Sequence, residues 1–437
     1  MYDILQLLEC LSPLMSTTTQ RHLGLIISAL LSMSGRVTML GLSRWTGKGG
    51  SYRSIQRFFY TDICWPTMLW LFFRQQCWGR HETYLLVGDE VVVTKSGHHT
   101  HGLGRFFSSL YSQPVSGLAF FGLSLVSLEE RRAFPIRIEQ VMPPPQCPKA
   151  SQSQGSQSRG RPKGSKNKDK TAVSLNRELL QIKGMLTAVF DLMLGTLSPT
   201  HLALDGHFGN NYAVQMAHRV GLQLVSKLRH DSVLYLPYTG AKGNRKYGER
   251  LHPKQMDPQF LMDCSIDEGI NTEIYQVHNA LHRQFAAALN VVIIVKTNLT
   301  TKAQAHVILF SSDETLPFQK VMDYYALRFQ IEFNFREAKQ FWGLEDFMNI
   351  TQTAVTNAVN LSFLMVNVSH RLLKDARQDH YDCSILDLKA SCRAFRYVEE
   401  VFNWLPQKPD PISWAQILSK VANLGAVHPR HSTERCS

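Results

Sequence analysis

Apolar residues follow a helical spacing in the first part of the chain and then change to strand-like runs. In residues 1–80 the spacing predicts helices, including an amphipathic stretch from Leu23 to Met33. The segments 84–95, 115–128 and 134–141 are rich in β-branched and aliphatic residues, which predicts three successive strands. The pattern therefore indicates a helical N-terminal region followed by a sheet.

Strands and helices alternate in the middle of the chain. Helices are predicted over 171–194 and 212–220, and short buried strands over 201–205 and 222–228. Several more β-rich runs lie within 230–310, and the remainder of the chain returns to a helical spacing. Alternation of this kind predicts a mixed sheet covered by helices, so we assign the chain to the α/β class.

The segment 37–60 has the pattern of a helix-turn-helix. A first helix would end at Trp45, a glycine-rich turn would follow, and Ser51 would cap a second helix. Arg53 and Arg57 would then share one exposed face of the second helix. Two interpretations stay open: a DNA-contacting helix with these arginines at phosphates or base edges, or an ordinary helical hairpin with solvated arginines.

A segment near the C-terminus has two faces of opposite character. Arg328, Glu332 and Lys339 follow Tyr325 by 3, 7 and 14 residues. At about 100° per residue they fall within roughly 60° of one another, so one helix face would carry a phenol, an acid and two cations. The opposite face would be an apolar stripe of Leu327, Ile331, Ala338 and Phe341. We predict a single amphipathic helix whose polar face carries chemistry.

Three carboxylates stand where a fold could bring them together. Asp89 follows the strand YLLVG, Asp205 ends the strand LAL, and Glu332 lies on the helix just described. Carboxylates that converge repel one another unless a cation neutralises them, and hard oxygen ligands select Mg²⁺ or Mn²⁺. Two such ions about 4 Å apart support phosphoryl transfer on nucleic acid. We therefore predict these acids as catalytic and metal-binding, with the phenol and the two cations of the helix holding phosphates.

Each of these residues also has an ordinary structural explanation. Asp89 could simply end a strand, Asp205 followed by glycine is a common turn pair, and Arg328 with Glu332 is a commonplace ion pair along a helix. Three acids in suitable elements, combined with an aligned basic and phenolic face, favour a site over these separate explanations.

The same residues carry a family resemblance. The order Asp89, Asp205, Glu332, the complete pattern Tyr-x2-Arg-x3-Glu-x6-Lys and the motif Asp-Gly-x-Phe at the second acid resemble the DDE transposases of bacterial insertion sequences. The resemblance covers roughly residues 84–345. It implies an enzyme that cuts the ends of its element and joins them to target DNA, with two divalent ions and usually as a homodimer.

The resemblance also implies a ribonuclease-H-like core. The first Asp would lie on its first strand, the second just after its fourth strand, and the Glu on a late helix. The chain would then comprise a helical DNA-end-binding domain (1–80), a first part of the core (81–229), a β-rich insertion (230–300), the completion of the core with the catalytic helix (301–348) and a helical C-terminal region available for dimerisation (349–437).

Some members of this family cleave the second strand through a hairpin intermediate and use an aromatic residue of the insertion to hold a flipped base. No Trp lies between Asp205 and Phe341 in this sequence. The tyrosines that could substitute are Tyr212, Tyr235, Tyr238 and Tyr247. The sequence leaves the hairpin step open.

Residues 143–170 form a polar, basic segment without an aliphatic core residue, which predicts a mobile surface segment. Within it, Arg159, Arg161 and Lys163 belong to an RGRPKG run that resembles the core of an AT-hook, in which arginines enter a narrow minor groove. The alternative is a solvated basic loop that binds any polyanion. We favour contact with DNA.

Composition narrows the partners. With 47 Lys and Arg against 35 Asp and Glu, the chain carries a formal charge of +12, which favours polyanions such as double-stranded DNA. No apolar run reaches the roughly 18 residues that cross a bilayer, and the one Gly-Lys loop lacks the spacing of a nucleotide-binding loop. We expect a cytoplasmic, nucleoid-associated bacterial protein with no membrane partner and no nucleotide cofactor.

Two other functions remain open. A catalytically silent DNA-binding protein derived from a transposase would share the fold but would not need all three acids. A stand-alone ribonuclease-H-like endonuclease would need the acids but no paired inverted ends beside its gene.

Overall fold

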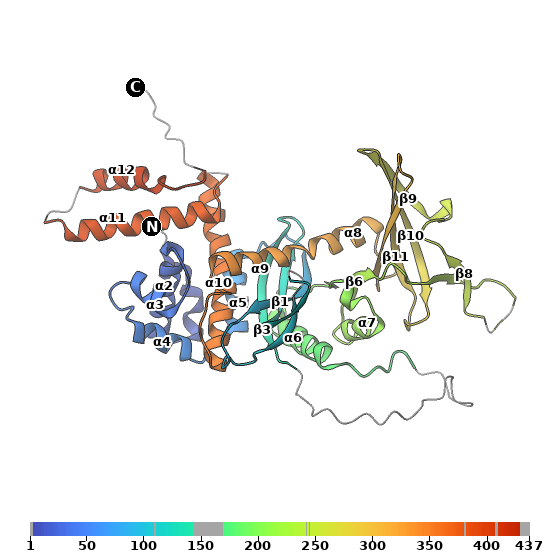
Figure 1. Cartoon of the computed structure of the whole chain (residues 1–437), viewed down its shortest axis with the longest axis horizontal. Coiled ribbons are helices and arrows are strands. Elements are labelled where there is room, and N and C mark those ends of the chain that lie inside the picture. The colour runs from blue at the N-terminus through green and yellow to red at the C-terminus, as the bar shows by residue number, and fades with distance from the viewer. Residues whose placement is uncertain are drawn as a thin grey trace, which may run out of the picture.

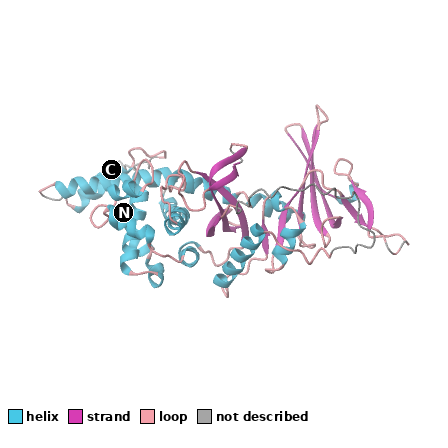
Figure 2. Ribbon diagram, turned by 60° about the horizontal axis from the view of Figure 1, so that its bottom comes forward, coloured by secondary structure: helices cyan, strands magenta, loops and turns pink. Residues whose placement is uncertain are grey.

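The protein is elongated, with helices gathered at one end and a sheet that extends to the other (Figure 1). Figure 2, turned by 60°, shows the same division between helical and strand-rich parts. The computed structural model describes residues 3–108, 111–143, 169–241, 243, 245–379, 382–406 and 410–428. The basic segment around Arg159, Arg161 and Lys163 lies outside these described residues.

Short helices build the N-terminal end. In chain order they are α1 (Ile4–Leu7), η1 (Glu9–Leu14), α2 (Thr17–Ser32), α3 (Met39–Trp45), α4 (Tyr52–Tyr60), α5 (Trp65–Phe72) and η2 (Phe73–Cys77). The predicted helix pair is confirmed as α3 and α4, and the Ser51 side chain accepts the N–H of Ser54 at the start of α4. Ile55 and Phe58 are buried, whereas Arg53 and Arg57 are exposed on the same helix.

The middle of the protein is a mixed sheet with helical cover. Its elements are β1 (Tyr84–Thr94), β2 (Gly104–Ser108), β3 (Gln113–Ser127), β4 (Arg132–Val141), α6 (Arg177–Met193), β5 (His201–Ala203), η3 (Gly206–Phe208), α7 (Asn211–His218) and β6 (Gln223–Leu228). Neighbouring strands follow the order β4-β3-β1-β5-β6; β1 is antiparallel to β3 and parallel to β5, and β5 is parallel to β6. The predicted strands and their order along the chain are confirmed, whereas β2 was not predicted. Helix α6 begins later than predicted because Asn176 caps it through the N–H of Leu179.

The sheet continues beyond β6 without a break in its hydrogen bonding. The added elements are β7 (Leu234–Pro237), β8 (Tyr247–Leu251), η4 (Pro258–Phe260), β9 (Leu261–Asp267), β10 (Ile270–His282), β11 (Leu289–Asn298) and β12 (Gln304–Ser311). The last of these strands returns to pair with β6, so that the path runs β6-β12-β11-β10-β7-β8. Twelve strands of the described residues therefore share one sheet.

The segment predicted as one amphipathic helix is two helices. Helix α8 (Phe318–Leu327) ends at Arg328, and α9 (Gln330–Phe341) begins after Phe329. Both linking residues keep right-handed helical torsions, but the N–H groups of Phe329, Ile331 and Glu332 bond three residues back. This tightening interrupts the helix. In Figure 1, α8 and α9 lie on one side of the sheet and α6 and α7 on the other.

Three helices complete the chain: α10 (Gln352–Asp379), α11 (Ile385–Trp404) and α12 (Pro411–Ala422). Helix α10 is buried along much of its length and packs against both the N-terminal helices and strand β4. Its Asn357 accepts the indole N–H of Trp65 at 2.7 Å and donates to the carbonyl of Phe59 at 2.8 Å. Its Asn367 donates to the carbonyl of Pro135 on β4 at 2.9 Å. Hydrogen bonds from these buried amides fix the position of α10. Among the described helices, none combines the length and the apolar character needed to cross a membrane.

Candidate active site

The first predicted acid lies on the central strand of the sheet. Asp89 is on β1, opposite Gly122 of β3, and its Oδ1 accepts the N–H of Glu90 at 2.8 Å. The preceding Gly88 has no room for a side chain, because a Cβ there would lie 2.8 Å from the Phe121 ring. Tight packing under the strand therefore holds the Asp89 carboxylate at a defined position.

The second acid lies beside the first. Strands β1 and β5 are parallel, and Leu86 and Val87 pair with Leu202 and Ala203. The same register continued by two residues brings Asp89 level with Asp205, and neighbouring strands are about 4.8 Å apart. Asp205 accepts the N–H of His207 at 3.1 Å and so caps the short helix that follows β5.

The third acid, on helix α9, is linked to the first through an arginine. Glu332 is in the first turn of α9, and 38% of its side chain is exposed. Arg328, at the interruption between α8 and α9, donates to Asp89 Oδ2 at 2.7 Å and to Glu332 Oε1 at 3.1 Å. Only 13% of the Arg328 side chain is exposed, so this guanidinium is a largely buried bridge between two carboxylates.

Electrostatics also indicates that the acids are close. The pKa of Asp89 is raised to about 6, mainly by burial and in smaller part by the negative charges of Asp205 and Glu332, although Arg328 lowers it. With one guanidinium for three carboxylates, the site keeps a surplus of negative charge. The structure therefore brings the three predicted acids into one electrostatic unit.

The donor set suits a hard divalent cation, since all three side chains offer carboxylate oxygens and share a need for positive charge. No three His, Cys, Asp or Glu side chains of the described residues lie close enough together to hold one ion in this arrangement. The geometry explains why: the Arg328 guanidinium lies between Asp89 and Glu332. An ion shared by these two carboxylates would have to displace it.

The other two residues of the predicted helix face are also engaged within the protein. The Tyr325 ring lies beside the Arg328 guanidinium, at 5.8 Å from ring centroid to Cζ, and burial raises its pKa. Lys339 donates to the carbonyl of Val92 at 2.9 Å and pairs with Glu345 at 3.0 Å. Their phosphate-holding role stays a prediction.

Two further residues predicted to bind DNA lie on a different element from the acids, whereas Arg159, Arg161 and Lys163 are outside the described residues. Arg53 and Arg57 are on α4, which packs against α2, α3 and α10 at the helical end. Two of the tyrosines considered for a flipped base, Tyr235 and Tyr247, are on β7 and β8. The sheet order separates β8 from β1 by seven strand spacings, about 34 Å along the sheet. These two tyrosines are therefore too distant to hold a base beside Asp89.

Sequence reasoning missed three polar residues next to the second acid. His207 pairs with Glu178 of α6 at 3.5 Å, and this contact raises the pKa of His207. Burial raises the pKa of Glu90, and the charge of Glu178 raises it further. The adjacency of Glu90 to the first acid and of His207 to the Asp-Gly pair was the available signal.

Comparison with known proteins gives one match to a family. The model of the family described as DDE superfamily endonuclease matches residues 6–302. That range contains Asp89 and Asp205 and ends before Glu332. No match to a curated protein was found.

Proposed function

The chain belongs to the DDE superfamily endonucleases, and from this premise we propose that it is a DNA transposase that cuts the ends of its own element and joins them to target DNA. The observation that carries the proposal is the convergence of Asp89, Asp205 and Glu332 from a central strand, the end of its parallel neighbour and a covering helix. The complete Tyr-Arg-Glu-Lys spacing supports a transposase over a general nuclease.

We further propose that the core is ribonuclease-H-like. The order β4-β3-β1-β5-β6, with β4, β3 and β1 antiparallel and β1, β5 and β6 parallel, supports this arrangement. If β2 is set aside as an added hairpin strand, the first acid lies on the first core strand and the second follows the fourth. Residues 230–300 would be the β-rich insertion, 1–80 the end-binding domain and 349–437 the region that pairs two subunits.

Asp89, Asp205 and Glu332 would together hold two Mg²⁺ or Mn²⁺ ions. When bound, such ions supply a Lewis acid that activates the attacking oxygen and stabilises the leaving oxygen. The protein residues supply position and charge. Packing around Gly88 fixes Asp89, the cap at η3 fixes Asp205, and Arg328, once released from its carboxylates, would be free to donate to a phosphate in fork geometry.

The substrate would be double-stranded DNA, both as element end and as target. Arg53 and Arg57 would contact the element end from α4, and Arg159, Arg161 and Lys163 would follow the minor groove beside it. Because the substrate is DNA, we assign the activity to the bacterial nucleoid and cytoplasm.

The test is to incubate purified protein with DNA that carries the sequences flanking its gene, with Mg²⁺, and to map the products. We expect cuts at paired inverted ends and joined products. Asp89→Asn should reduce cutting by about a thousandfold or more, as the loss of roughly 4 kcal/mol of transition-state stabilisation would do.

Asp191→Asn is the matched control, because Asp191 is an exposed residue of α6. It should leave cutting unchanged. Cutting without joining would favour the stand-alone endonuclease, and end binding without any cutting would favour the silent DNA-binding protein. Cutting by Asp89→Asn at the wild-type rate would exclude the proposed site.

A further inference from the structure

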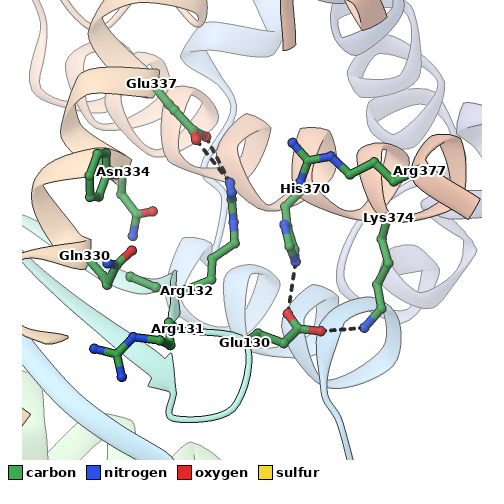
Figure 3. A pocket seen from close by; sticks show the side chains of 11 residues that line it. Glu130, Arg131, Arg132, Gln330, Asn334, Glu337, His370, Lys374 and Arg377 are labelled. Carbon is green, nitrogen blue, oxygen red and sulfur yellow. Dashed lines mark hydrogen bonds and ion pairs between the residues drawn. The ribbon is translucent and has the colours of Figure 1, made fainter. Parts of the chain in front are cut away.

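A second, chemically different site lies on the other flank of α9. An open cavity of about 620 Å³ is lined by the β3–β4 turn, α9 and the C-terminal half of α10 (Figure 3). Gln330, Asn334 and Glu337 of α9 line this cavity, whereas Arg328 and Glu332 contact one another on the side of Asp89. The width of one helix, about 10 Å, separates the two sites.

The cavity carries a surplus of positive charge. Four of the residues that line it are Lys or Arg and two are Glu, and Arg131 pairs with Asp323 outside the lining at 2.7 Å, which leaves a surplus of one cation. Glu130 pairs with Lys374 at 2.7 Å and with His370 at 3.4 Å, and Glu337 accepts two hydrogen bonds from Arg132 at 3.1 and 3.2 Å. Figure 3 shows these pairs on the cavity wall. Both acids are therefore already neutralised.

One arginine of the cavity has no acidic partner among the described residues. Arg377 gives its Nε–H to the carbonyl of Cys383 at 2.9 Å, and no ion pair to its guanidinium is present in the described part of the chain. Its terminal N–H groups are thus available to an anion. A guanidinium with free parallel N–H groups matches the geometry of phosphate.

Two buried nitrogens of the cavity wall lack hydrogen-bond partners in the described structure. They are Arg132 Nε, a donor, and His370 Nδ1. His370 is only 9% exposed, and its Nε2 faces the Glu130 carboxylate, so the ring proton lies on Nε2 and Nδ1 is an acceptor. Both atoms have almost no solvent-accessible surface, so a ligand in the cavity does not reach them. The requirement for an anion therefore comes from the Arg377 guanidinium, which has no ion pair within the described residues.

An aromatic wall adds a second feature. Phe333 lines the cavity, is 37% exposed and packs edge to face with Phe329 at 5.6 Å. The Arg336 guanidinium lies over one face of the ring at 4.7 Å, so a base could stack only on the other face. An anion and a flat ring together are the chemistry of a nucleotide.

We propose that this cavity binds a nucleotide, with its phosphate at Arg132 and Arg377 and its base against Phe333. The nucleotide would be either the end of a DNA strand or a free mononucleotide. We favour the end of a DNA strand, and this assignment rests on the proposed function. The volume suits one nucleotide, since small-molecule sites typically measure about 300 to 1,000 Å³.

The test measures binding by the full-length protein in EDTA, so that no divalent ion and no cleavage contribute. The probes are deoxyadenosine 5′-monophosphate, a short single-stranded oligonucleotide with a 5′-phosphate, and the same oligonucleotide with a 5′-hydroxyl. Isothermal titration calorimetry gives each dissociation constant. We expect the 5′-phosphate oligonucleotide to bind about tenfold more tightly than its 5′-hydroxyl counterpart. Tighter binding of the free mononucleotide would assign the cavity to the free pool.

Arg377→Gln should abolish the preference for a 5′-phosphate. Arg371→Gln is its matched control, because it removes the same charge from the same helix at a residue that does not line the cavity. Phe333→Ala should weaken the probes that carry a base but not inorganic phosphate. Glu332→Gln should leave all of these constants unchanged, which separates a failure of this proposal from a failure of the proposed catalytic site. Equal weakening by Arg377→Gln and Arg371→Gln, or equal binding of the two oligonucleotides, would overturn the proposal.

Discussion

The two flanks of helix α9 bury charge in opposite ways. On the acid flank, one guanidinium serves two carboxylates, and burial, with a smaller contribution from the charges of Asp205 and Glu332, raises the pKa of Asp89 to about 6. On the cavity flank each acid has its own cation, and the contacts with His370 and Lys374 lower the pKa of Glu130 to about 2.

The difference shows that the charges left after ion pairing, more than the residue types present, decide which ligand a site attracts. Both flanks mix acids with arginines. The acid flank is short of positive charge and suits a cation, whereas the cavity flank has one cation too many and suits an anion.

The largest effect should come from exchanging one acid on each flank. Glu332→Gln should reduce DNA cutting about a thousandfold or more, because it removes one of the three proposed metal ligands. Glu337→Gln, on the same helix, should leave cutting within a few-fold and should strengthen nucleotide binding, because it frees Arg132. Gel-based cleavage assays and calorimetry measure the two effects. A loss of cutting by Glu337→Gln that matched Glu332→Gln would remove the functional distinction between the flanks.

A smaller effect is expected from Arg328→Gln. Without its guanidinium the carboxylates of Asp89 and Glu332 lose their shared partner, so the free energy of unfolding in EDTA should fall by about 1–3 kcal/mol. Mn²⁺ should restore more stability to this variant than to the wild type, because an ion no longer has to displace the arginine. Denaturant unfolding in EDTA and in Mn²⁺ tests both points, with Arg336→Gln as the exposed control on α9. An identical response to Mn²⁺ in wild type and variant would contradict the competition.

The smallest predicted effects are opposite pH dependences. Burial raises the pKa of Asp89 to about 6, so the folded protein keeps a proton that the unfolded chain releases near pH 4. The contribution of Asp89 to the free energy of unfolding therefore falls as the pH rises from about 4 to about 6. Burial lowers the pKa of His370 to about 4, so below about pH 6.5 the unfolded chain takes up a proton that the folded protein does not bind. The contribution of His370 to the free energy of unfolding therefore falls as the pH drops.

In the wild type these two contributions partly cancel between pH 4 and pH 6.5. Asp89→Asn removes the contribution that falls with pH, so its free energy of unfolding should rise about 2 kcal/mol more than that of the wild type over this range. His370→Gln removes the contribution that rises with pH, so its free energy of unfolding should rise about 2 kcal/mol less. Urea unfolding at a series of pH values measures both. Parallel pH profiles for the two variants would show that these groups do not titrate as described.

Local composition was enough to predict most of the fold. The segments that became β1, β3, β4 and β11 are long and rich in β-branched residues, and their prediction was confirmed. Strand β2 was missed because it has only five residues and alternates between half-buried and exposed positions, so it lacks a strong apolar signal. The interruption at Phe329 was missed because helical periodicity does not register a change of hydrogen-bond partner when the torsions stay helical.

The candidate site was predictable only in part. Asp205 lies just after a strand, as predicted, whereas Asp89, predicted to follow a strand, lies in the middle of β1. The i,i+4 spacing indicated the contact between Arg328 and Glu332. The second bond of Arg328, to Asp89, joins residues 239 positions apart and follows only from the packing of α9 on β1. The cavity could not be predicted from the sequence either, because its walls come from three segments with no common spacing.

Because β12 returns to pair with β6, the segments before and after the β9–β10 turn are held together by strand hydrogen bonds as well as by the covalent chain. The hairpin tip at Glu268 and Gly269, where both residues adopt positive φ, lies between two strands far from this pairing. A protease that cut only there would leave two fragments joined by the β6–β12 and β9–β10 hydrogen bonds. Such a nicked protein should migrate as one species on a native gel and as two on a denaturing gel.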